Sequence, residues 1–503
     1  AEAWLGRSNR EPSGHAGSPA RSAVGFVCGQ AGRRAGGGAK LSAAAANAST
    51  MTTGEPTDYA AVTDYLFGLK AHGVRFGIDR MALLVAELGH PERAVPCIHV
   101  AGTNGKGSVA AMLDAILHAA GWRTGLYTSP HLVKLGERVQ VERRALTEAE
   151  IVTYARELRP AAERVAAENP GDHPSFFEFM TAMALLQFAR KGCDVSVIEV
   201  GLGGRLDATN IIPAPIVTGI AQLGLDHEAF LLDPENGPGY PPLERIGFEK
   251  ASIAKSGAPL VTMAYPKAVM ARVAEVAAGV GAPLVAQTQG WDCAAQQGQL
   301  HYSDTHGALV VPLPRLPGQH QCTNAGLAIA MLRHQSVLNI PEAAYQVAMG
   351  AAHWPARLQL LTPGPLTEHL PEADEIWLDG GHNPNAAEMI ASFFQSRGQA
   401  SSKPDIILGM LANKNVRTFL QILAPVVRSV TAVPILGHEH HSPEAVMAMA
   451  TDAGLGETYA APDVAAALNQ LATARTGEKP RVAILGSLYL AGLVLQANGQ
   501  LPD

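Results

Sequence analysis

The sequence has few cysteines and no long apolar run. Its 503 residues include five cysteines, none in a Cys-x-x-Cys pair: Cys28, Cys97, Cys193, Cys293 and Cys322. This scattered pattern argues against a structural zinc site and indicates a reducing compartment. No stretch approaches the roughly 18 consecutive apolar residues of a membrane-spanning helix, so we expect no membrane partner. Positive charge is not in excess, because the formal net charge is −7, and nucleic acid is not expected as a partner either.

Acidic residues are scarce in residues 1–50, where only Glu2 and Glu11 occur. This segment is rich in Ala, Gly, Ser and Arg and precedes the first methionine, Met51. A segment of this composition is expected to be disordered. We interpret it as upstream sequence before a start at Met51, with the protein in the cytoplasm. The alternative is an organelle transit peptide, which has a similar Arg- and Ser-rich, acid-poor composition.

The most informative segment is 98–108, which reads IHVAGTNGKGS. An apolar run ends there in a glycine-rich turn with one lysine and one hydroxyl, and a helical apolar pattern follows it: Val109, Met112, Leu113, Ile116 and Leu117. In such a loop, backbone N–H groups and the helix N-terminus bind phosphate. Lys106 can reach the terminal phosphates, and the Ser108 hydroxyl can ligate Mg²⁺.

The spacing of this loop departs from the common phosphate-loop pattern. Gly102 is only three positions before Gly105, and Gly107 separates Lys106 from Ser108. The alternative interpretation is a tight strand-to-helix turn with a solvated lysine. The strand before the loop and the helix after it favour nucleotide binding.

Apolar periodicity predicts an α/β protein, with a parallel sheet covered by helices on both faces. Helices are expected at 58–70, 79–88, 147–167 and 176–191, and strands at 97–101, 124–128, 194–200 and 216–221. A polar stretch at 287–312 predicts short antiparallel strands, and a helix follows at 324–332. A second, smaller Rossmann-like series then begins, with strands at 375–378, 406–408, 430–433 and 482–485 and a helix from Pro384. The predicted domains are 51–355, with the phosphate loop, and 356–503.

Polar residues follow two strands of the first predicted sheet. Glu199 ends one strand and precedes the glycine-rich segment 201–210, and Asp226-His227 follows the next strand along the chain. Ligands bind at strand ends in an open parallel sheet. A carboxylate and an imidazole at neighbouring strand ends can therefore hold Mg²⁺ on ATP, although Mg²⁺ prefers oxygen ligands. For His227 alone, the alternative is a hydrogen-bonded loop histidine.

Two further segments are candidates. Lys250 lies on a predicted helix, and its alternative is an ordinary surface lysine. The segment 379–384, DGGHNP, follows the first strand of the second domain and opens onto a helix. It is either a ligand-side loop or an ordinary helix start, with Asn383 as the cap and Pro384 at the first position.

Together these motifs resemble the folylpolyglutamate synthase/dihydrofolate synthase family, the folate branch of the Mur-ligase-type ATP-dependent ligases. The resemblance runs in order over about residues 58–500 and rests on the segments 102–108, 128–132, 177–179, 199–210, 226–227, 249–251, 324, 357–359 and 379–384. It implies a Mur-ligase-like architecture, with a C-terminal glutamate-ligase domain. It also implies that ATP converts a carboxylate to an acyl phosphate, which the amine of L-glutamate attacks.

The resemblance implies the following roles. ATP would bind at Thr103, Asn104, Gly105, Lys106, Gly107, Ser108, Asn324, Arg357, Asp379 and His382. Two Mg²⁺ ions would be held by Ser108, Ser129, Glu199 and His227. Lys250 matches the family's carbamylated lysine, and it counts with Lys106, His227 and Glu199 as catalytic. Substrate-side candidates are Phe177, Glu178, Arg205, Asp207 and Arg138.

The acceptor is expected to be both a tetrahydrofolate and dihydropteroate, and the protein is expected to be a monomer. Polyglutamylation alone is the first alternative. A Mur-type ligase for another acceptor is disfavoured, because a UDP-binding domain does not fit into the about 50 residues between Met51 and Gly102. A nucleotide-binding protein without ligase activity would not need the strand-end acid, the histidine and the second-domain motif together.

Three features depart from the family pattern. Ser252 follows Glu-Lys-Ala where glycine is usual, and Gly381 stands where alanine is common. A Pro- and Gly-rich insertion at 233–242 lengthens the spacing between His227 and Lys250 and is expected to lie near the metal site.

Overall fold

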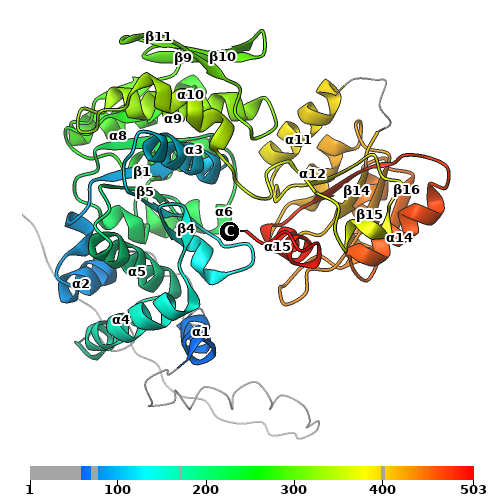
Figure 1. Ribbon diagram of the computed structural model, residues 1–503, viewed down its shortest axis with the longest axis horizontal. Helices are drawn as coiled ribbons and strands as arrows, with labels where there is room; N and C mark the ends of the chain where they lie inside the picture. The colour runs from blue at the N-terminus through cyan, green and yellow to red at the C-terminus, as the bar shows by residue number, and fades with distance from the viewer. Residues whose placement is uncertain (1–57, 70–76, 169–172, 398–402, 503) are drawn as a thin grey trace, which may run out of the picture. The chain divides into compact units, whose positions relative to one another are not determined.

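Two sheets and a three-stranded ribbon organise the computed structural model, which describes residues 58–69, 77–168, 173–397 and 403–502 (Figure 1). These residues belong to one compact unit, Glu55–Asp503. The expected disorder of residues 1–50 lies outside the described residues. In the described part of the chain, no helix is both long and apolar enough to cross a bilayer.

The first sheet has eight strands. They are β1 (Cys97–Ala101), β2 (Thr124–Tyr127), β3 (Val139–Val141), β4 (Arg144–Ala145), β5 (Val195–Glu199), β6 (Val217–Ile220), β7 (Leu260–Thr262) and β8 (Leu284–Ala286). Their order is β4-β3-β2-β5-β1-β6-β7-β8. The six strands from β2 to β8 are parallel, whereas β3 and β4 pair antiparallel at one edge. The predicted parallel sheet therefore carries an antiparallel edge that its short strands did not reveal.

The helices of this part of the chain have the following bounds. They are α1 (Tyr59–Gly68), α2 (Asp79–Glu87), α3 (Lys106–Ala119), α4 (Glu148–Glu168), α5 (Phe176–Arg190), α6 (Glu228–Leu231), α7 (Pro242–Ala251), α8 (Lys267–Val280), α9 (His320–His334) and α10 (Glu342–Ala351). Short 3₁₀ turns are η2 (Pro91–Arg93), η3 (Leu135–Arg138), η4 (Ala208–Ile211) and η5 (Pro234–Asn236). Asp58 caps α1, and Ser175 and Glu178 form a capping box at α5.

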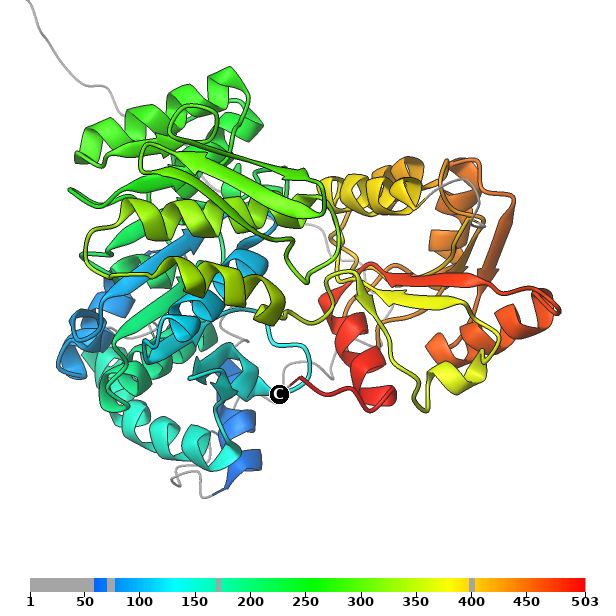
Figure 2. The same cartoon turned by 45° about the horizontal axis from the view of Figure 1, so that its top comes forward.

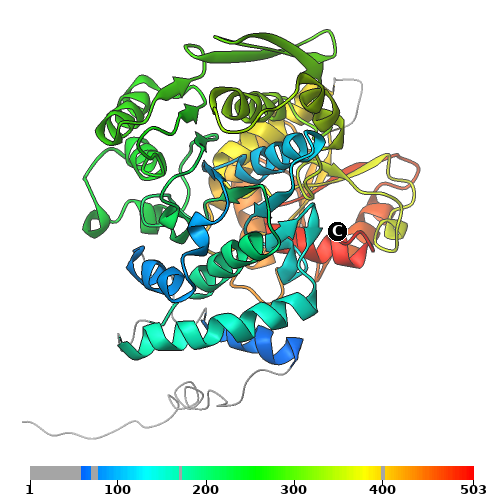
Figure 3. The ribbon, with the colours of Figure 1, turned by 60° about the vertical axis from the view of Figure 1, so that its left-hand side comes forward.

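Successive side chains of a strand point to opposite faces of the sheet, and because apolar side chains lie on both faces, helices pack on both. Ile98 and Val100 of β1 join a core with α3, α9 and α10, whereas Cys97 joins a second core with α1, α2, α4 and α5. Figure 3 shows the second layer, in which α4 lies beside α5. A third core joins α7 and α8 to β6 and β7.

The predicted antiparallel strands at 287–312 are confirmed. They are β9 (Trp291–Gln296), β10 (Gln299–Asp304) and β11 (Gly307–Pro312), in the order β11-β10-β9. Trp291, Leu300 and Val311 bury their side chains in the core that contains α9. The ribbon lies beside α9 and α10 (Figure 2).

The second sheet has six strands. They are β12 (Gln359–Leu360), β13 (Glu375–Leu378), β14 (Asp405–Leu408), β15 (Ser429–Ala432), β16 (Glu457–Ala460) and β17 (Arg481–Leu485), in the order β12-β13-β17-β14-β15-β16. All neighbours are parallel except β12 and β13. The turn η6 (Thr367–His369) and five helices complete this part: α11 (Pro384–Ser396), α12 (Val416–Leu423), α13 (Pro443–Asp452), α14 (Val464–Ala474) and α15 (Leu488–Ala497).

Alternation also explains the layers around the second sheet. Ile406 and Leu408 of β14 contribute to a core with α11, α12 and α13, and Ile407 contributes to a core with α14 and α15. The predicted strands at 375–378, 406–408, 430–433 and 482–485 and the helix from Pro384 are present within one residue at each end. The short edge strands β12 and β16 were missed.

Candidate active site

The loop between β1 and α3 has the geometry of a phosphate-binding loop. Gly105, the N-cap of α3, has φ +86°, a left-handed conformation that glycine adopts readily. A Cβ on Gly105 would lie 2.6 Å from Oδ1 of Asn324, and a Cβ on Gly107 would lie 2.6 Å from Nε1 of Trp354. Side chains from two other segments therefore approach the loop so closely that a Cβ at either position would displace them.

Lys106 lies over the loop that precedes it. Its Nζ donates hydrogen bonds to the carbonyl oxygens of Gly102, at 2.9 Å, and Thr103, at 3.2 Å. The N-terminus of the 14-residue helix α3 adds partial positive charge at the same place. The loop thus gathers a cation and backbone N–H groups where an anionic ligand would bind.

Thr103 and Asn104 tie the loop to its neighbours. Both backbone N–H groups donate to the carbonyl of Gln222, and Thr103 Oγ1 donates to the carbonyl of Gly224 at 2.9 Å. The amide side chains of Asn104 and Asn383 exchange two hydrogen bonds, at 3.1 and 3.0 Å. These contacts fix the loop to the segment after β6 and to the start of α11.

Glu199 and His227 follow strands that flank the strand of the phosphate loop. The sheet order β5-β1-β6 places β1 between them, so the expectation that they follow adjacent strands is corrected. In the sequence, β1 comes well before β5 and β6, so the order of the strands along the chain does not show that β1 pairs with both. The result still brings both side chains to the same edge of the sheet as Lys106.

Glu199 is a buried carboxylate with few partners. Its side chain accepts one hydrogen bond, from the backbone N–H of Ser129 at 3.2 Å, and among the described residues it forms no ion pair. Burial raises the pKa of Glu199, and the charges of Lys106 and Arg357 offset only part of that increase. The carboxylate therefore has capacity for a further cation.

Asp226 connects the two sheets' loops through three side chains. Its carboxylate lies 2.6 Å from Nζ of Lys414 and 3.5 Å from Nε2 of His382, and it accepts a hydrogen bond from Asn383 at 3.2 Å. Although burial raises the pKa of Asp226, His382, His227 and Lys414 hold it well below its ordinary value. Asp226 is therefore an ionised anchor between the loop after β6 and the loops after β13 and β14.

His227 and Lys250 lie in a region of positive charge. His227 has φ +54° and directly precedes α6. Burial lowers its pKa to about 4, against the raising effect of Asp226. Burial, with the charge of Lys106, lowers the pKa of Lys250 to about 7. Both side chains therefore have unprotonated forms accessible near neutral pH.

The loop after β13 is both a helix start and part of the site. Asn383 caps α11 by accepting a hydrogen bond from the N–H of Ala386 at 3.0 Å. The Asp379 carboxylate accepts hydrogen bonds from the N–H groups of Leu358, at 2.8 Å, and Gly381, at 2.6 Å. The helix-cap interpretation is therefore confirmed, and the same residues also face Asn104 and Asp226.

One cavity of about 150 Å³ collects most of the predicted site residues. The predicted residues that line it are Thr103, Asn104, Gly105, Lys106, Gly107, Ser108, Ser129, Glu199, His227, Asn324, Arg357, Asp379 and His382. They come from seven separate segments of the chain. The fold therefore brings together the ATP and metal candidates, whereas Lys250 is buried and does not line this cavity.

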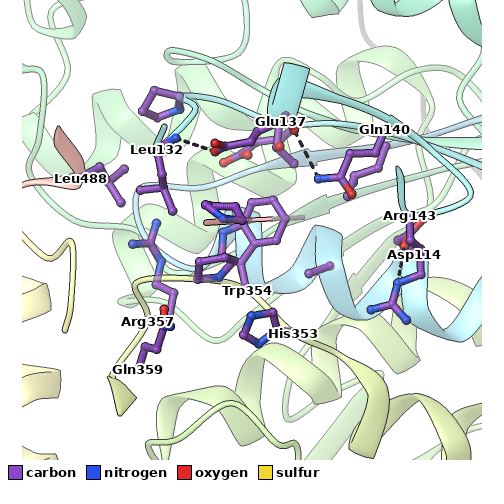
Figure 4. A pocket seen from close by; sticks show the side chains of 18 of the residues that line it. Asp114, Leu132, Glu137, Gln140, Arg143, His353, Trp354, Arg357, Gln359 and Leu488 are labelled. Atoms are coloured by element: carbon purple, nitrogen blue, oxygen red, sulfur yellow. Dashed lines mark hydrogen bonds and ion pairs between the residues drawn. The ribbon is translucent and has the colours of Figure 1, made fainter. Parts of the chain in front are cut away.

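A second cavity of about 620 Å³ shares lining residues with the first. Gly107, Ser129, Glu199 and Arg357 line both. Figure 4 shows Trp354 and Arg357 on one side of it and the segment with Leu132 and Glu137 on the other. The Glu137 carboxylate accepts hydrogen bonds from the N–H groups of Leu132, Val133 and Lys134.

The predicted substrate-side residues line neither of these cavities. Glu178 is buried in the capping box of α5 and lies 3.2 Å from Arg80. The ring of Phe177 packs where a Cβ on Gly201 would be, at 2.3 Å. These contacts give Glu178 a structural role, and substrate contact by either residue stays a prediction.

Arg205 is used inside the protein to hold the insertion at 233–242. Its guanidinium pairs with Glu249 of α7 at 3.1 Å and donates to the carbonyl of Asn236. Arg245 pairs with the same carboxylate at 2.8 Å and donates to the carbonyl of Pro238 at 2.7 Å. The insertion is therefore attached to the helix that carries Lys250, and substrate contact by Arg205 stays a prediction.

Asp207 and Arg138 are also engaged within the fold. The Asp207 carboxylate accepts hydrogen bonds from the N–H of Leu202 at 2.8 Å and from Oγ1 of Thr209 at 2.5 Å. Nε of Arg138 donates to Nδ1 of His131 at 2.8 Å. Both residues order the loops around the site, and their contact with substrate stays a prediction.

Comparison with known proteins decides the family. A model described as "Dihydrofolate synthetase, C-terminal domain" matches residues 366–497. The dihydrofolate synthase/folylpolyglutamate synthase of Escherichia coli K12 is 33% identical over 374 residues, which are 74% of this chain and 81% of that protein. The chain belongs to the folylpolyglutamate synthase/dihydrofolate synthase family. The resemblance inferred from the motifs is thereby confirmed.

Two further relatives describe the extent of the similarity. A Halobacterium salinarum protein named "Probable bifunctional folylpolyglutamate synthase/dihydropteroate synthase" is 35% identical over 67% of this chain, and the chain spans only 40% of its length. The structure of Escherichia coli FolC in complex with DHPP and ADP has 31% identity and a TM-score of 0.75, and the match covers 88% of this chain and 98% of that one. The predicted two-part α/β fold of this family is confirmed.

Several residues of this family member's site were not predicted from the sequence. Gln321, one helical turn before Asn324, donates to Oγ of Ser108 at 3.4 Å, and it accepts from Asn324 at 2.9 Å. Lys414 follows β14 and pairs with Asp226. The rule that ligand-side residues follow parallel strands could have indicated Lys414, and the i, i+3 spacing could have indicated Gln321.

Proposed function

We propose that this protein is an ATP-dependent ligase that adds L-glutamate to tetrahydrofolates and to dihydropteroate. The observation that carries the proposal is the single cavity that joins the phosphate loop, Glu199, and the Arg357 and Asp379 segments. The names of the relatives, which include both activities, support both acceptors. The alternatives are polyglutamylation alone and ligation to another acceptor.

The reaction has two steps. The γ-phosphoryl group of ATP passes to an oxygen of the acceptor carboxylate, which gives an acyl phosphate and ADP. The amine of L-glutamate then attacks the acyl carbon, the carbon–oxygen bond to phosphate breaks, and the amine loses a proton. Lys106 and the N-terminus of α3 would stabilise negative charge on the phosphoryl group in the first step.

The nucleotide would be bound by both parts of the described chain. Gly105, Lys106, Gly107 and Ser108 would hold the phosphate oxygens, whereas Thr103 and Asn104, whose backbone N–H groups donate to Gln222, would fix the loop that contacts ATP. Asn324, Arg357, Asp379 and His382 would contact the rest of ATP. We propose domain limits at 51–355 and 356–503. ATP would then contact Asn324 and the phosphate loop in the first domain, and the other three residues in the second.

The donor set fits Mg²⁺. Ser108, Ser129 and Glu199 supply oxygen donors at one cavity, and Glu199 is a buried carboxylate without an ion pair in the described residues. Mg²⁺ is usually held by one or two carboxylates together with substrate phosphates and water. Ser108 and Glu199 would hold one ion, which would neutralise phosphate charge, and His227 would contribute to a second ion. Among the described residues, no group of three or more His, Cys, Asp or Glu forms a complete metal site.

Lys250 is proposed to be carbamylated, and this modification should depend on pH. A neutral amine attacks carbon dioxide, and burial lowers the pKa of Lys250 to about 7, so the reactive form increases from pH 6 to pH 8. We expect a carbamate carbonyl signal in ¹³C NMR after incubation with labelled bicarbonate, stronger at pH 8 than at pH 6. The Lys250→Met variant should lack it, whereas Lys267→Met, at an exposed position, should keep it. A signal that persists in Lys250→Met would assign the carbamate to another amine.

The proposed function is tested by phosphate release with Mg²⁺-ATP and L-glutamate. Parallel samples contain tetrahydrofolate, dihydropteroate or neither pterin. Release with both, dependent on glutamate, is the expected result. Release with tetrahydrofolate alone would restrict the activity to polyglutamylation. Release with neither, in folded protein that binds ATP, would contradict the proposal, and sedimentation of the same sample tests the expected monomer.

A further inference from the structure

The second cavity adjoins a third cavity, which none of the phosphate-loop residues lines. The cavity of about 620 Å³ shares Glu137 and Arg143 with one of about 900 Å³. Each is within or near the size range of a pocket for a ligand of several hundred daltons. Because the 620 Å³ cavity also shares Glu199 with the phosphate-loop cavity, the three adjoin in a row that leads away from the phosphate loop, here called the path.

The third cavity is lined by more cations than anions. Its cationic residues are Arg123, Lys134, Arg143, Arg144 and Lys191, and its acidic residues are Glu137, Glu148 and Glu150. Two of the three acids already have partners. Glu137 accepts three backbone hydrogen bonds, and Glu150 pairs with Lys191 at 2.8 Å.

Two of the cations have no partner within the described residues. Lys134 and Arg144 are exposed and form no ion pair there, whereas Arg123 pairs with Glu142 at 3.1 Å. A carboxylate bound between Lys134 and Arg144 would therefore not have to displace an existing ion pair. Their positive charge is available to an anionic ligand.

Arg143 lies where the second and third cavities meet. It occupies the turn between β3 and β4, where Glu142 and Arg143 have φ +52° and +63°. Residues other than glycine adopt this left-handed conformation only rarely. The Arg143 side chain donates to the carbonyl of Ala351 at 3.0 Å and lies 3.6 Å from the buried carboxylate of Asp114 (Figure 4). The turn thus holds a guanidinium in the wall of the path.

We propose that the path from the phosphate loop past Arg143 to Lys134 and Arg144 binds the oligo-γ-glutamyl tail of a folate acceptor. This inference rests on the proposed ligase function and names a part of the acceptor site. When a folate is extended, the reacting γ-carboxyl group belongs to its last glutamate. Each glutamate added earlier leaves one α-carboxylate between that group and the pterin, so the acceptor next to the reaction centre is a chain of regularly spaced anions.

The inference is tested with tetrahydropteroyl acceptors that carry one, three or five glutamates. The enzyme and the double variant Lys134→Gln/Arg144→Gln are compared by glutamate-dependent phosphate release. Each exposed ion pair is worth a factor of about 1.4 to 5, so loss of both should raise KM for the three- and five-glutamate acceptors by about 2- to 25-fold in the variant. KM for the one-glutamate acceptor and kcat should change less than about 2-fold, because a short tail does not reach these residues.

The control is Lys267→Gln, which removes one exposed positive charge from the start of α8, outside the path. It should leave all three KM values unchanged. Added salt should raise KM for the long acceptors in the parent protein more than in the double variant. An equal KM change for every tail length, or no change, with activity retained, would overturn the inference alone. Absence of phosphate release with any folate in the parent protein would instead contradict the proposed function.

Discussion

Replacing Lys106 by alanine is expected to lower glutamate-dependent phosphate release by about 1,000-fold, the range for removing a charge that stabilises a transferring phosphoryl group. Lys106 is the cation at the N-terminus of α3, and its Nζ contacts only carbonyl oxygens of the preceding loop. Removing it therefore breaks no ion pair with another part of the described chain. Stability should change little, and the loss should appear in kcat rather than in the unfolding temperature.

The measurement compares initial rates of phosphate release with thermal unfolding of the same samples. Lys267→Ala serves as the matched control, because it removes a lysine from an exposed position on another helix. Near-normal turnover in Lys106→Ala would refute the assignment of the loop. Loss of turnover together with loss of folding would show that Lys106 is needed for the fold instead.

Replacing Gly105 by alanine is expected to lower turnover by about 100-fold, as displacements of about 1 Å at a reaction centre do. The new Cβ would lie 2.6 Å from Oδ1 of Asn324. Asn324 is buried and bonded to Gln321, so it cannot move away without disturbing the contact of Gln321 with Ser108. Either the loop or α9 must shift, and both contribute to the nucleotide cavity.

Gly121 provides the matched control for this substitution. It follows the other end of α3 and has the same φ of +86°, but a Cβ there would meet nothing within 4 Å. Gly121→Ala should therefore show only the backbone cost, about 1–2 kcal/mol in the free energy of unfolding, with turnover retained. Gly105→Ala should lose at least as much stability as Gly121→Ala, and only Gly105→Ala should lose ATP affinity, measured by calorimetry. Equal ATP affinity in both would contradict a specific role for the close approach at Gly105.

The sequence was most informative where chemistry depends on neighbouring residues. The order of glycines, lysine and serine in 102–108 predicted a phosphate loop between a strand and a helix, and β1 and α3 are found there. The DGGHNP segment predicted a helix start at Pro384 with Asn383 as its cap, and both are present. Such features are local, because a turn or a cap is determined by residues a few positions apart.

The sequence was less informative about side chains that have partners far along the chain. Substrate contact by Glu178 and Arg205 stays a prediction, and the sequence did not indicate that Glu178 pairs with Arg80 or that Arg205 pairs with Glu249, which is 44 residues away. The sequence alone does not show whether an arginine in a functional motif binds a ligand or pairs with a carboxylate of its own protein. The ion pair between Arg205 and Glu249 is visible only in the tertiary structure, in which α7 packs against the loop after β5.

The sequence by itself determined the phosphate loop, the two-part α/β pattern and the family, because these depend on local spacing and on apolar periodicity. The tertiary structure alone decided that β1 lies between β5 and β6, that Asp226 pairs with Lys414, and that three cavities adjoin, the last of them lined by more cations than anions. The physical reason is that strand order and ion pairing depend on how segments far apart in the sequence pack against one another and exclude water. No short stretch of sequence contains that information.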